Sequence, residues 1–253
     1  MMAPSCKKSL VQKRALIVLT NISKLPGKDA ADVCFTGFDA RAVAHLWSLL
    51  KVRNFYQIDY CTPEGGPAPL DPRSADESKD DPIVQSFLQN KTLVDTFQDT
   101  MSAKSIVESM TEYSLIGLVG AHGALIDVAA SQDIAKLVTI VYEQNGLICA
   151  IGHGLCGALC SQTSLTSFPG IPLLKEKKVT SSTRSEDEQQ TAHVPFFLDE
   201  RLMALGAWVL NKGPFEINVC IDYGNDETGK IVTGQNTASV PAWIELIETL
   251  IIQ

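Results

Sequence analysis

A sharp elbow between a strand and a helix constrains the fold of this chain most. Residues 147–151 form an apolar run that predicts a buried strand, and Gly152 follows it at a turn into a small-residue helix. Nucleophile elbows have this shape, with the reactive side chain at the apex and a glycine two residues further on. Gly154 supplies that second glycine, but the apex itself is Gly152. The elbow therefore has no side chain that could attack a substrate.

Composition predicts one sizeable globular domain. The chain has 253 residues, of which 45% are hydrophobic and 20% are charged. We expect a tail at 1–13 and a single domain over 14–253, with a helical elaboration at about 75–110. The net charge of −8 argues against partners such as nucleic acid or an anionic membrane surface. No apolar run has the length of a membrane span, and residues 1–14 lack the apolar core of a signal peptide, so we expect a cytoplasmic protein.

The cysteines and histidines favour neither disulfides nor a metal site. Seven cysteines are present, an odd number, and none belongs to a CxxC pair. We interpret them as mostly reduced core thiols. The four histidines are scattered, without the spacing of zinc ligands. We therefore expect no metal and no cofactor.

Short apolar runs alternate with helical patterns along the chain. Such alternation predicts an α/β fold: a three-layer sandwich with a mostly parallel, flavodoxin-like sheet. The expected strands are 15–20, 57–61, 113–119, 147–151, 216–221 and 231–233, with a short strand at 178–180. The expected helices are 38–50, two or three short ones within 80–110, one from the N-cap Ser131 to Glu143, 194–205 and 238–251. Residues 62–74 are rich in turn formers.

Several motifs, taken in order, resemble the ThiJ/PfpI superfamily, a branch of the class I glutamine-amidotransferase-like fold. The resemblance is greatest to its larger members of the chaperone and glutathione-independent glyoxalase type. It extends from about residue 14 to the C-terminus. The motifs are Thr36-Gly37-Phe38, Thr62-Pro63-Glu64-Gly65-Gly66, Asp71-Pro72-Arg73-Ser74, residues 121–127 (AHGALID), Gly152-His153-Gly154, residues 194–198 (VPFFL) and residues 232–236 (VTGQN).

The resemblance implies catalytic positions, and this chain departs from two of them. Active members of that branch use Cys, His and Glu. The Cys position is Gly152, the His position is His153, and the Glu, counted from Gly37, falls at Ala42. Two of the three functional groups are therefore missing, which argues against the glyoxalase, deglycase and protease-like activities of the family.

His153 is the remaining candidate catalytic residue. It is either a leftover histidine in a polar cleft or a general acid/base or ligand contact. With alanine at position 42, the sequence shows no carboxylate that would fix its tautomer. Arg41 lies beside Ala42 but is expected to point away around the helix.

Two turns at strand ends are candidates for ligand binding. In the family, the turn at residues 121–123 helps to form an oxyanion hole, and the helix N-terminus at His153 adds further N–H donors. These donors favour a small carbonyl or carboxylate ligand, unless both turns are purely structural. The candidate ligand-binding residues are Ala121, His122, Gly123, Gly152, His153 and Gly154.

Other nucleophiles are less well placed in the sequence. Cys156 is one helical turn beyond the apex, too far to replace the thiol, and with Cys149 it is expected in the core. Cys34 could reach the rim of the site. No GxSxG motif supports serine catalysis. Residues 181–192 are interpreted as a solvated loop with a helix start, capped by Ser185 with Glu188, or as a regulatory or partner segment.

Three functional hypotheses follow. We favour a catalytically silent homologue of the glyoxalase and chaperone type that acts as a small-molecule-binding or interaction module. The second is a lyase or hydratase with relocated acid/base chemistry at His153. The third is a holdase-like chaperone that uses exposed apolar surface. The resemblance also implies a homodimer.

Overall fold

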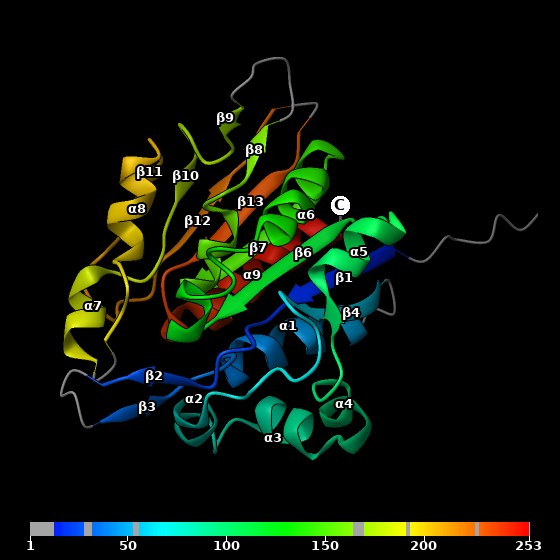
Figure 1. The fold of residues 1–253 in the computed structure, drawn as a ribbon, viewed down its shortest axis with the longest axis vertical. Coiled ribbons are helices and arrows are strands. Elements are labelled where there is room, and N and C mark those ends of the chain that lie inside the picture. The colour runs from blue at the N-terminus through cyan, green and yellow to red at the C-terminus, as the bar shows by residue number, and fades with distance from the viewer. Residues whose placement is uncertain are drawn as a thin grey trace, which may run out of the picture.

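A seven-stranded sheet forms the centre of the protein (Figure 1). The computed structural model describes residues 13–27, 32–52, 56–163, 170–190, 193–225 and 228–252, so Cys6 and all but the last residue of the expected tail lie outside it. The strand order is β12-β13-β7-β6-β1-β4-β5. Their bounds are β1 Lys13–Val18, β4 Tyr56–Thr62, β5 Met101–Ser102, β6 Leu115–Gly120, β7 Leu147–Gly152, β12 Val219–Asp222 and β13 Lys230–Gly234.

The central strands are parallel and buried on both faces. All residues of β6 and β7 are buried, which explains their continuous apolar sequences. Only β12 runs antiparallel to its neighbour, β13. Three two-stranded sheets flank the main one: β2 Lys24–Pro26 with β3 Val33–Phe35, β8 Gln162–Thr163 with β9 Ile171–Pro172, and β10 Lys178–Val179 with β11 Trp208–Val209.

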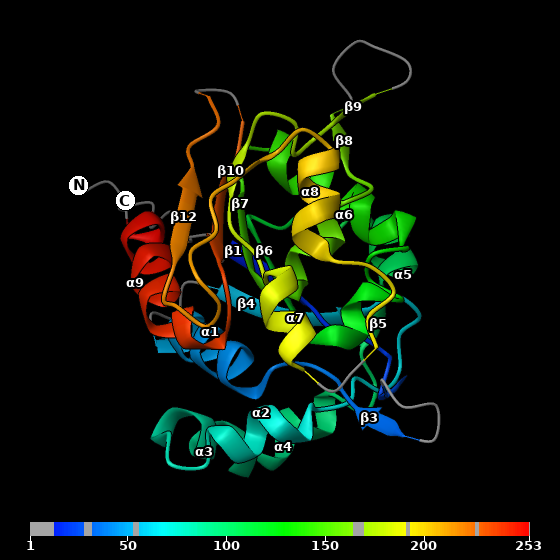
Figure 2. The ribbon, with the colours of Figure 1, turned by 90° about the vertical axis from the view of Figure 1, so that its left-hand side faces the viewer.

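Helices cover both faces of the sheet (Figure 2). One core cluster joins the sheet to α1 (Ala40–Val52) and α9 (Val240–Ile251). The other joins the opposite face to α5 (Ala103–Ser109), α6 (Gln132–Glu143) and α8 (Leu198–Ala204). Successive side chains of the parallel strands point to opposite faces of the sheet and contribute to these two cores. The fold is therefore the expected three-layer α/β sandwich.

Three short helices form the elaboration beside α1, together at one end of the molecule in Figure 1. They are α2 Pro72–Glu77, α3 Pro82–Gln89 and α4 Lys91–Thr96. Side chains of Asp71, Asp81 and Asn90 cap them in turn. Phe97 fastens this group, because its ring lies 5.0 Å from Phe38 and 5.6 Å from Phe87.

The predicted fold class is confirmed, and several boundaries need correction. The helix from the Ser131 cap to Glu143 is confirmed. The segment after the elbow is a 3₁₀ turn, His153–Ala158, because its glycines pack against the sheet. The helix predicted at 194–205 begins only at Leu198. The turn-rich stretch 62–74 ends within α2, which starts at Pro72. The division into one domain stays a prediction.

Parallel strands place several chain turns at one edge of the sheet. Strands β6, β7 and β13 all end there, and residues 121–123, 153–158 and 235–237 follow them. Ligands of open α/β sheets bind outside the carboxyl ends of the strands, so the fold itself directs attention to this edge. None of the described helices combines the length and the apolar character of a membrane span.

Candidate functional site

Gly152 forms the apex of the elbow with a left-handed backbone. Its φ is +54° and its ψ is −129°, a conformation that L side chains rarely adopt. A Cβ at this position would lie 3.2 Å from Ser182 Oγ. The space beside the apex is therefore bordered by a serine hydroxyl.

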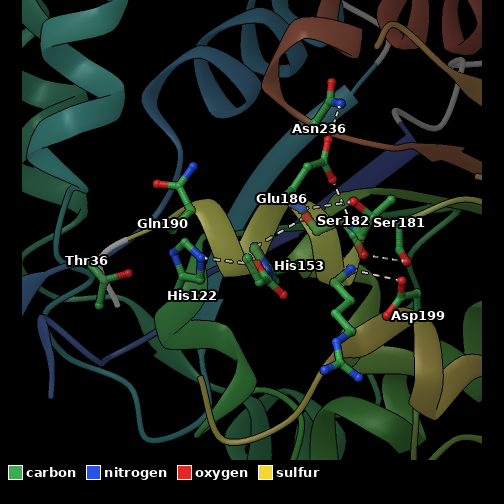
Figure 3. Close-up of polar contacts among 12 residues, drawn as sticks. Thr36, His122, His153, Ser181, Ser182, Glu186, Gln190, Asp199 and Asn236 are labelled. Carbon is green, nitrogen blue, oxygen red and sulfur yellow. Dashed lines mark hydrogen bonds and ion pairs between the residues drawn. The ribbon is translucent and has the colours of Figure 1, made fainter. Parts of the chain in front are cut away.

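The register of β6 and β7 brings two histidines together. Gly120 pairs with Gly152 at the ends of these strands, so the turns that follow are neighbours. His122 and His153 stand in those turns, and their ring centroids are 4.5 Å apart. Figure 3 shows the two rings side by side next to helix α7.

Helix α7 (Arg184–Gln189) is fixed over this edge by a buried carboxylate. Thr183 and Glu186 form a reciprocal capping box. The Glu186 carboxylate also accepts a hydrogen bond from the backbone N–H of Phe215 at 2.7 Å. It accepts another from the side chain of Asn236, also at 2.7 Å (Figure 3). These bonds anchor the helix to the loops that precede β12 and follow β13.

Asp187, the next residue on α7, holds His153. His153 Nε2 lies 2.8 Å from Asp187 Oδ1, and both side chains are buried. An ionised carboxylate only accepts hydrogen bonds, so Nε2 carries the hydrogen and Nδ1 is the basic nitrogen. Ser182 Oγ lies 3.4 Å from that Nδ1. The expectation that nothing fixes the His153 tautomer is wrong, because Asp187 does.

His122 adds a second imidazole to the same carboxylate. Its Nε2 lies 3.3 Å from Asp187 Oδ1 without the alignment of a hydrogen bond, and its Nδ1 lies 3.4 Å from Arg73 Nη2. Burial and the charge of His153 lower the pKa of His122. Burial opposes ionisation of Asp187, but the charge and hydrogen bond of His153 and the nearby His122 outweigh it and hold that pKa well below its usual range.

A cavity of about 420 Å³ opens beside these groups. That volume suits a small molecule. Its wall carries two guanidinium groups, from Arg41 and Arg73, and more carboxylates than cations. The carboxylates are Asp39, Asp71, Glu77, Glu186 and Asp187. Burial raises the pKa of Asp39, despite its hydrogen bond from Thr237.

Three groups of the site have ligand atoms close enough to hold a metal ion. The atoms of His122, His153 and Asp187 lie within 4.8 Å of one another. The expectation of scattered histidines is wrong for this pair, because 30 intervening residues form a strand and helix that return to the same edge. His122 Nδ1 accepts from the Arg73 N–H, so the hydrogen of the neutral ring is on Nε2. Nε2 of His122 is therefore a hydrogen-bond donor rather than a metal ligand.

The structure brings four of the six candidate ligand-binding residues to the cavity. Ala121, His122, Gly152 and His153 line it. Gly123 and Gly154 do not, which corrects that expectation. The Gly123 N–H donates to Thr36 Oγ1 at 3.1 Å, and a Cβ on Gly154 would lie 2.1 Å from the Leu118 carbonyl oxygen. Both are packing glycines, and the Ala121 N–H is also used, by the Gly37 carbonyl.

The residues expected around the lost glutamate position also need correction. Ala42 is fully buried in the core, and its N–H donates to Asp39 Oδ1 at 2.8 Å. Asp39 and Arg41 both line the cavity, although Arg41 was expected to point away from it. The start of α1 therefore contributes two polar groups to the cavity, from Asp39 just before the helix and Arg41 in its first turn.

No cysteine of the described chain borders the cavity. Cys149 and Cys156 are fully buried core residues, as predicted, and burial raises the pKa of both thiols. Cys34 lies in β3 and is not part of the cavity wall. The site has no thiol nucleophile.

Known proteins resemble this chain in sequence and in fold. Curated relatives named protein/nucleic acid deglycase HchA, from Escherichia coli and Shigella flexneri, are 24% identical over 136 residues, which is 53% of this chain and 47% of theirs. The chain thus matches about half the length of these relatives. No family model matches it.

Solved structures cover nearly the whole chain. Rapid Encystment Protein 24 KDa of Francisella tularensis is 25% identical, with a TM-score of 0.77 over 94% of this chain and 98% of that one. Glyoxalase III of Candida albicans is 20% identical, with a TM-score of 0.72 over 93% and 96%. These sequence and structural similarities support the ThiJ/PfpI superfamily as the family of this chain. Its relatives support the branch of the glyoxalase III and chaperone proteins.

The sequence analysis did not identify Ser182, Glu186 and Asp187 as residues of the site. They lie in a segment interpreted as a solvated surface loop, yet all three are buried. The predicted cap at Ser185 with Glu188 is wrong. The capping box is formed two residues earlier, by Thr183 and Glu186. Residues 191 and 192 lie outside the described part. The Thr-x-x-Glu pattern was the available signal for the true start of α7.

A side chain at residue 152 should destabilise the fold. Gly152→Ala places a Cβ on a left-handed backbone, which costs about 1–2 kcal/mol. We expect a lower urea midpoint with an unchanged slope. Gly66→Ala is a control for the backbone cost alone, since Gly66 has a φ of +71°, a Cβ there would meet nothing within 4 Å, and the residue does not line the cavity. An unchanged or raised midpoint for Gly152→Ala would contradict the elbow geometry.

Acidification should weaken the fold through His122. Because its pKa is lowered in the folded chain, the unfolded chain binds more protons below the ordinary value of about 6.5. Stability is therefore full above that pH and falls below it, with a contribution from this group of up to about 1.4 kcal/mol per pH unit. The pKa of Asp187 is also lowered, so its contribution to the free energy of unfolding is lost only below about pH 3.8, the ordinary pKa of this group.

The check is urea unfolding at pH 7, 6 and 5. We expect the free energy of unfolding to fall over this range in the unmodified protein and to fall less in His122→Gln. The exposed His193 provides the matched control, and His193→Gln should keep the original slope. Identical pH dependence in His122→Gln and the unmodified protein would refute the assignment.

Proposed function

We propose that this protein performs non-covalent acid/base chemistry on a small hydroxylated carbonyl compound, as a lyase or hydratase, with His153 as the base. The observation that carries the proposal is the hydrogen bond of 2.8 Å between His153 and the buried Asp187. A carboxylate in this place orients the imidazole and stabilises its charged form, which is what a general base requires.

The first chemical step is abstraction of a proton from the carbon next to a carbonyl. Nδ1 of His153 takes that proton, because Nε2 already donates to Asp187. The electron pair of the broken C–H bond moves toward the carbonyl oxygen and gives an enolate. Expulsion of a β-hydroxyl, protonated by the imidazolium, completes a dehydration, and the reverse sequence is a hydration.

Two buried atoms support binding of such a substrate. His122 Nε2 and Asp187 Oδ2 have no hydrogen-bond partner among the residues that the structure describes. The neutral His122 N–H can donate to the carbonyl oxygen where negative charge develops. Asp187 Oδ2 can accept from a substrate hydroxyl. Buried polar atoms without partners carry a desolvation cost, which a ligand with these two groups removes.

The charge of the cavity favours a neutral carbonyl over a carboxylate ligand. Its carboxylates outnumber its guanidinium groups, and Arg41 and Arg73 already lie 3.5 Å from Asp81 and Asp71. The donors expected to hold an anion are also used within the fold, since Ala121 and Gly123 donate to Gly37 and Thr36. The names of the relatives, glyoxalase III and deglycase, agree with a carbonyl substrate.

Catalytic silence is the second candidate function. The glycine at residue 152 favours it, because covalent thiol catalysis at the elbow needs a side chain there. In that case the cavity would serve a small-molecule-binding or interaction module. A holdase-like role would instead use exposed apolar side chains such as Phe35, Trp208 and Tyr223. A homodimer and a cytoplasmic location stay predictions.

Proton exchange separates the active from the silent alternative. In D₂O, we expect the protein to accelerate loss of the α-proton signals of dihydroxyacetone and glyceraldehyde, measured by proton NMR. His153→Gln should reduce the exchange rate by about 10²-fold or more, the usual contribution of a general base. Asp187→Asn should reduce it as well, because it removes the acceptor that fixes the tautomer.

His193→Gln is the matched control, since it removes a histidine outside this cavity. It should exchange protons at the rate of the unmodified protein. Exchange at the background rate for both carbonyl compounds, with binding of either one still detectable, would favour the silent module. Exchange that survives His153→Gln would overturn the choice of base.

A further inference from the structure

A serine hydroxyl borders the place that the elbow leaves without a nucleophile. Ser182 Oγ is the atom nearest to a Cβ built on Gly152, at 3.2 Å. Ser182 comes from the segment before α7, so its hydroxyl reaches the apex from a different part of the chain. Its side chain is buried and borders the cavity, where a small substrate would lie.

The side chains of Ser182, His153 and Asp187 form a chain of polar contacts. Ser182 Oγ lies 3.4 Å from His153 Nδ1, and His153 Nε2 lies 2.8 Å from Asp187 Oδ1. A hydroxyl, a base and an acceptor that orients the base are the parts of an activated nucleophile, and the first contact is often longer in the absence of substrate.

The segment that carries the hydroxyl and the carboxylate is held firmly. Ser182 and Asp187 flank the capping box of Thr183 and Glu186, and Glu186 is tied to Phe215 and Asn236. The relative positions of the hydroxyl and the carboxylate are thus set by one short helical turn. The base reaches them from the end of β7.

We propose that Ser182 is the nucleophile of an acyl-transfer site that accepts small uncharged esters. The Ser182 proton moves to His153 Nδ1 while Oγ bonds to the acyl carbon and the C=O electron pair moves onto oxygen. Collapse expels the alcohol, which takes the proton from His153. Water then attacks the acyl carbon of the acyl-serine and passes a proton to His153. The bond between that carbon and Ser182 Oγ breaks, the carboxylic acid leaves, and His153 returns the proton to Oγ. His122 Nε2 is the candidate donor to the oxyanion.

This activity shares the pair His153 and Asp187 with the proposed function but adds a covalent step. Proton exchange on a carbonyl compound needs no hydroxyl at residue 182, and acylation needs no enolisable substrate. Failure of one therefore leaves the other standing. If Ser182 only orients the imidazole, its hydroxyl remains unreactive.

The test is labelling of the full chain with a small alkyl fluorophosphonate. Ser182 Oγ bonds to phosphorus, fluoride leaves, and the proton passes to His153. We expect one adduct, mapped to Ser182 by tandem mass spectrometry, with a labelling rate about 10²-fold lower in His153→Gln. Ser185→Ala removes an exposed serine of the adjoining helix α7 and should label normally.

Ser182→Ala should abolish the adduct, and a second variant at the same residue keeps the proposal testable if Ser182→Ala does not fold. Ser182→Cys should react with iodoacetamide at residue 182, faster than the cysteines of the natural sequence, and this rate should also fall in the double variant with His153→Gln. No fluorophosphonate adduct at Ser182 in a folded protein, or labelling that is indifferent to His153→Gln, would overturn the proposal.

Discussion

Two adjacent buried carboxylates on helix α7 hold the site of this protein together. Glu186 fastens the helix to the loops around β12 and β13, and Asp187 fastens it to the histidines after β6 and β7. Buried carboxylates are costly unless several donors satisfy them. The position of Ser182, which directly precedes the capping box, depends on this helix lying where those donors meet.

The elbow forms a regular turn without a side chain at its apex. Glycine adopts the left-handed backbone at residue 152 without steric cost, so the turn and the neighbouring His153 keep their places. The reactive groups of the site lie around the cavity rather than at the apex of the elbow. An imidazole with a fixed tautomer, a neutral second imidazole and a buried hydroxyl surround a cavity without a thiol, which points to acid/base or serine chemistry rather than thiol chemistry.

The sequence predicts the parts of this structure that local patterns determine. The apolar runs predicted the parallel strands, whereas the family resemblance placed the two turns after β6 and β7, and with them His122 and His153, in one candidate site. The segment with Ser182 and Asp187 is polar and looked solvated. Its burial results from donors near residues 215 and 236, which come from distant loops and leave no mark on the local pattern. Gly123 and Gly154 failed as ligand contacts for a related reason, since their neighbours are Thr36 and Leu118.

The most direct test of this account is the tautomer of His153. Nitrogen-15 NMR of histidine-labelled protein distinguishes a protonated imidazole nitrogen from an unprotonated one. If Asp187 fixes the ring, His153 in its neutral form carries the hydrogen on Nε2, leaves Nδ1 unprotonated, and loses this preference in Asp187→Asn. A neutral His153 with the hydrogen on Nδ1, or a tautomer that Asp187→Asn does not change, would contradict the account.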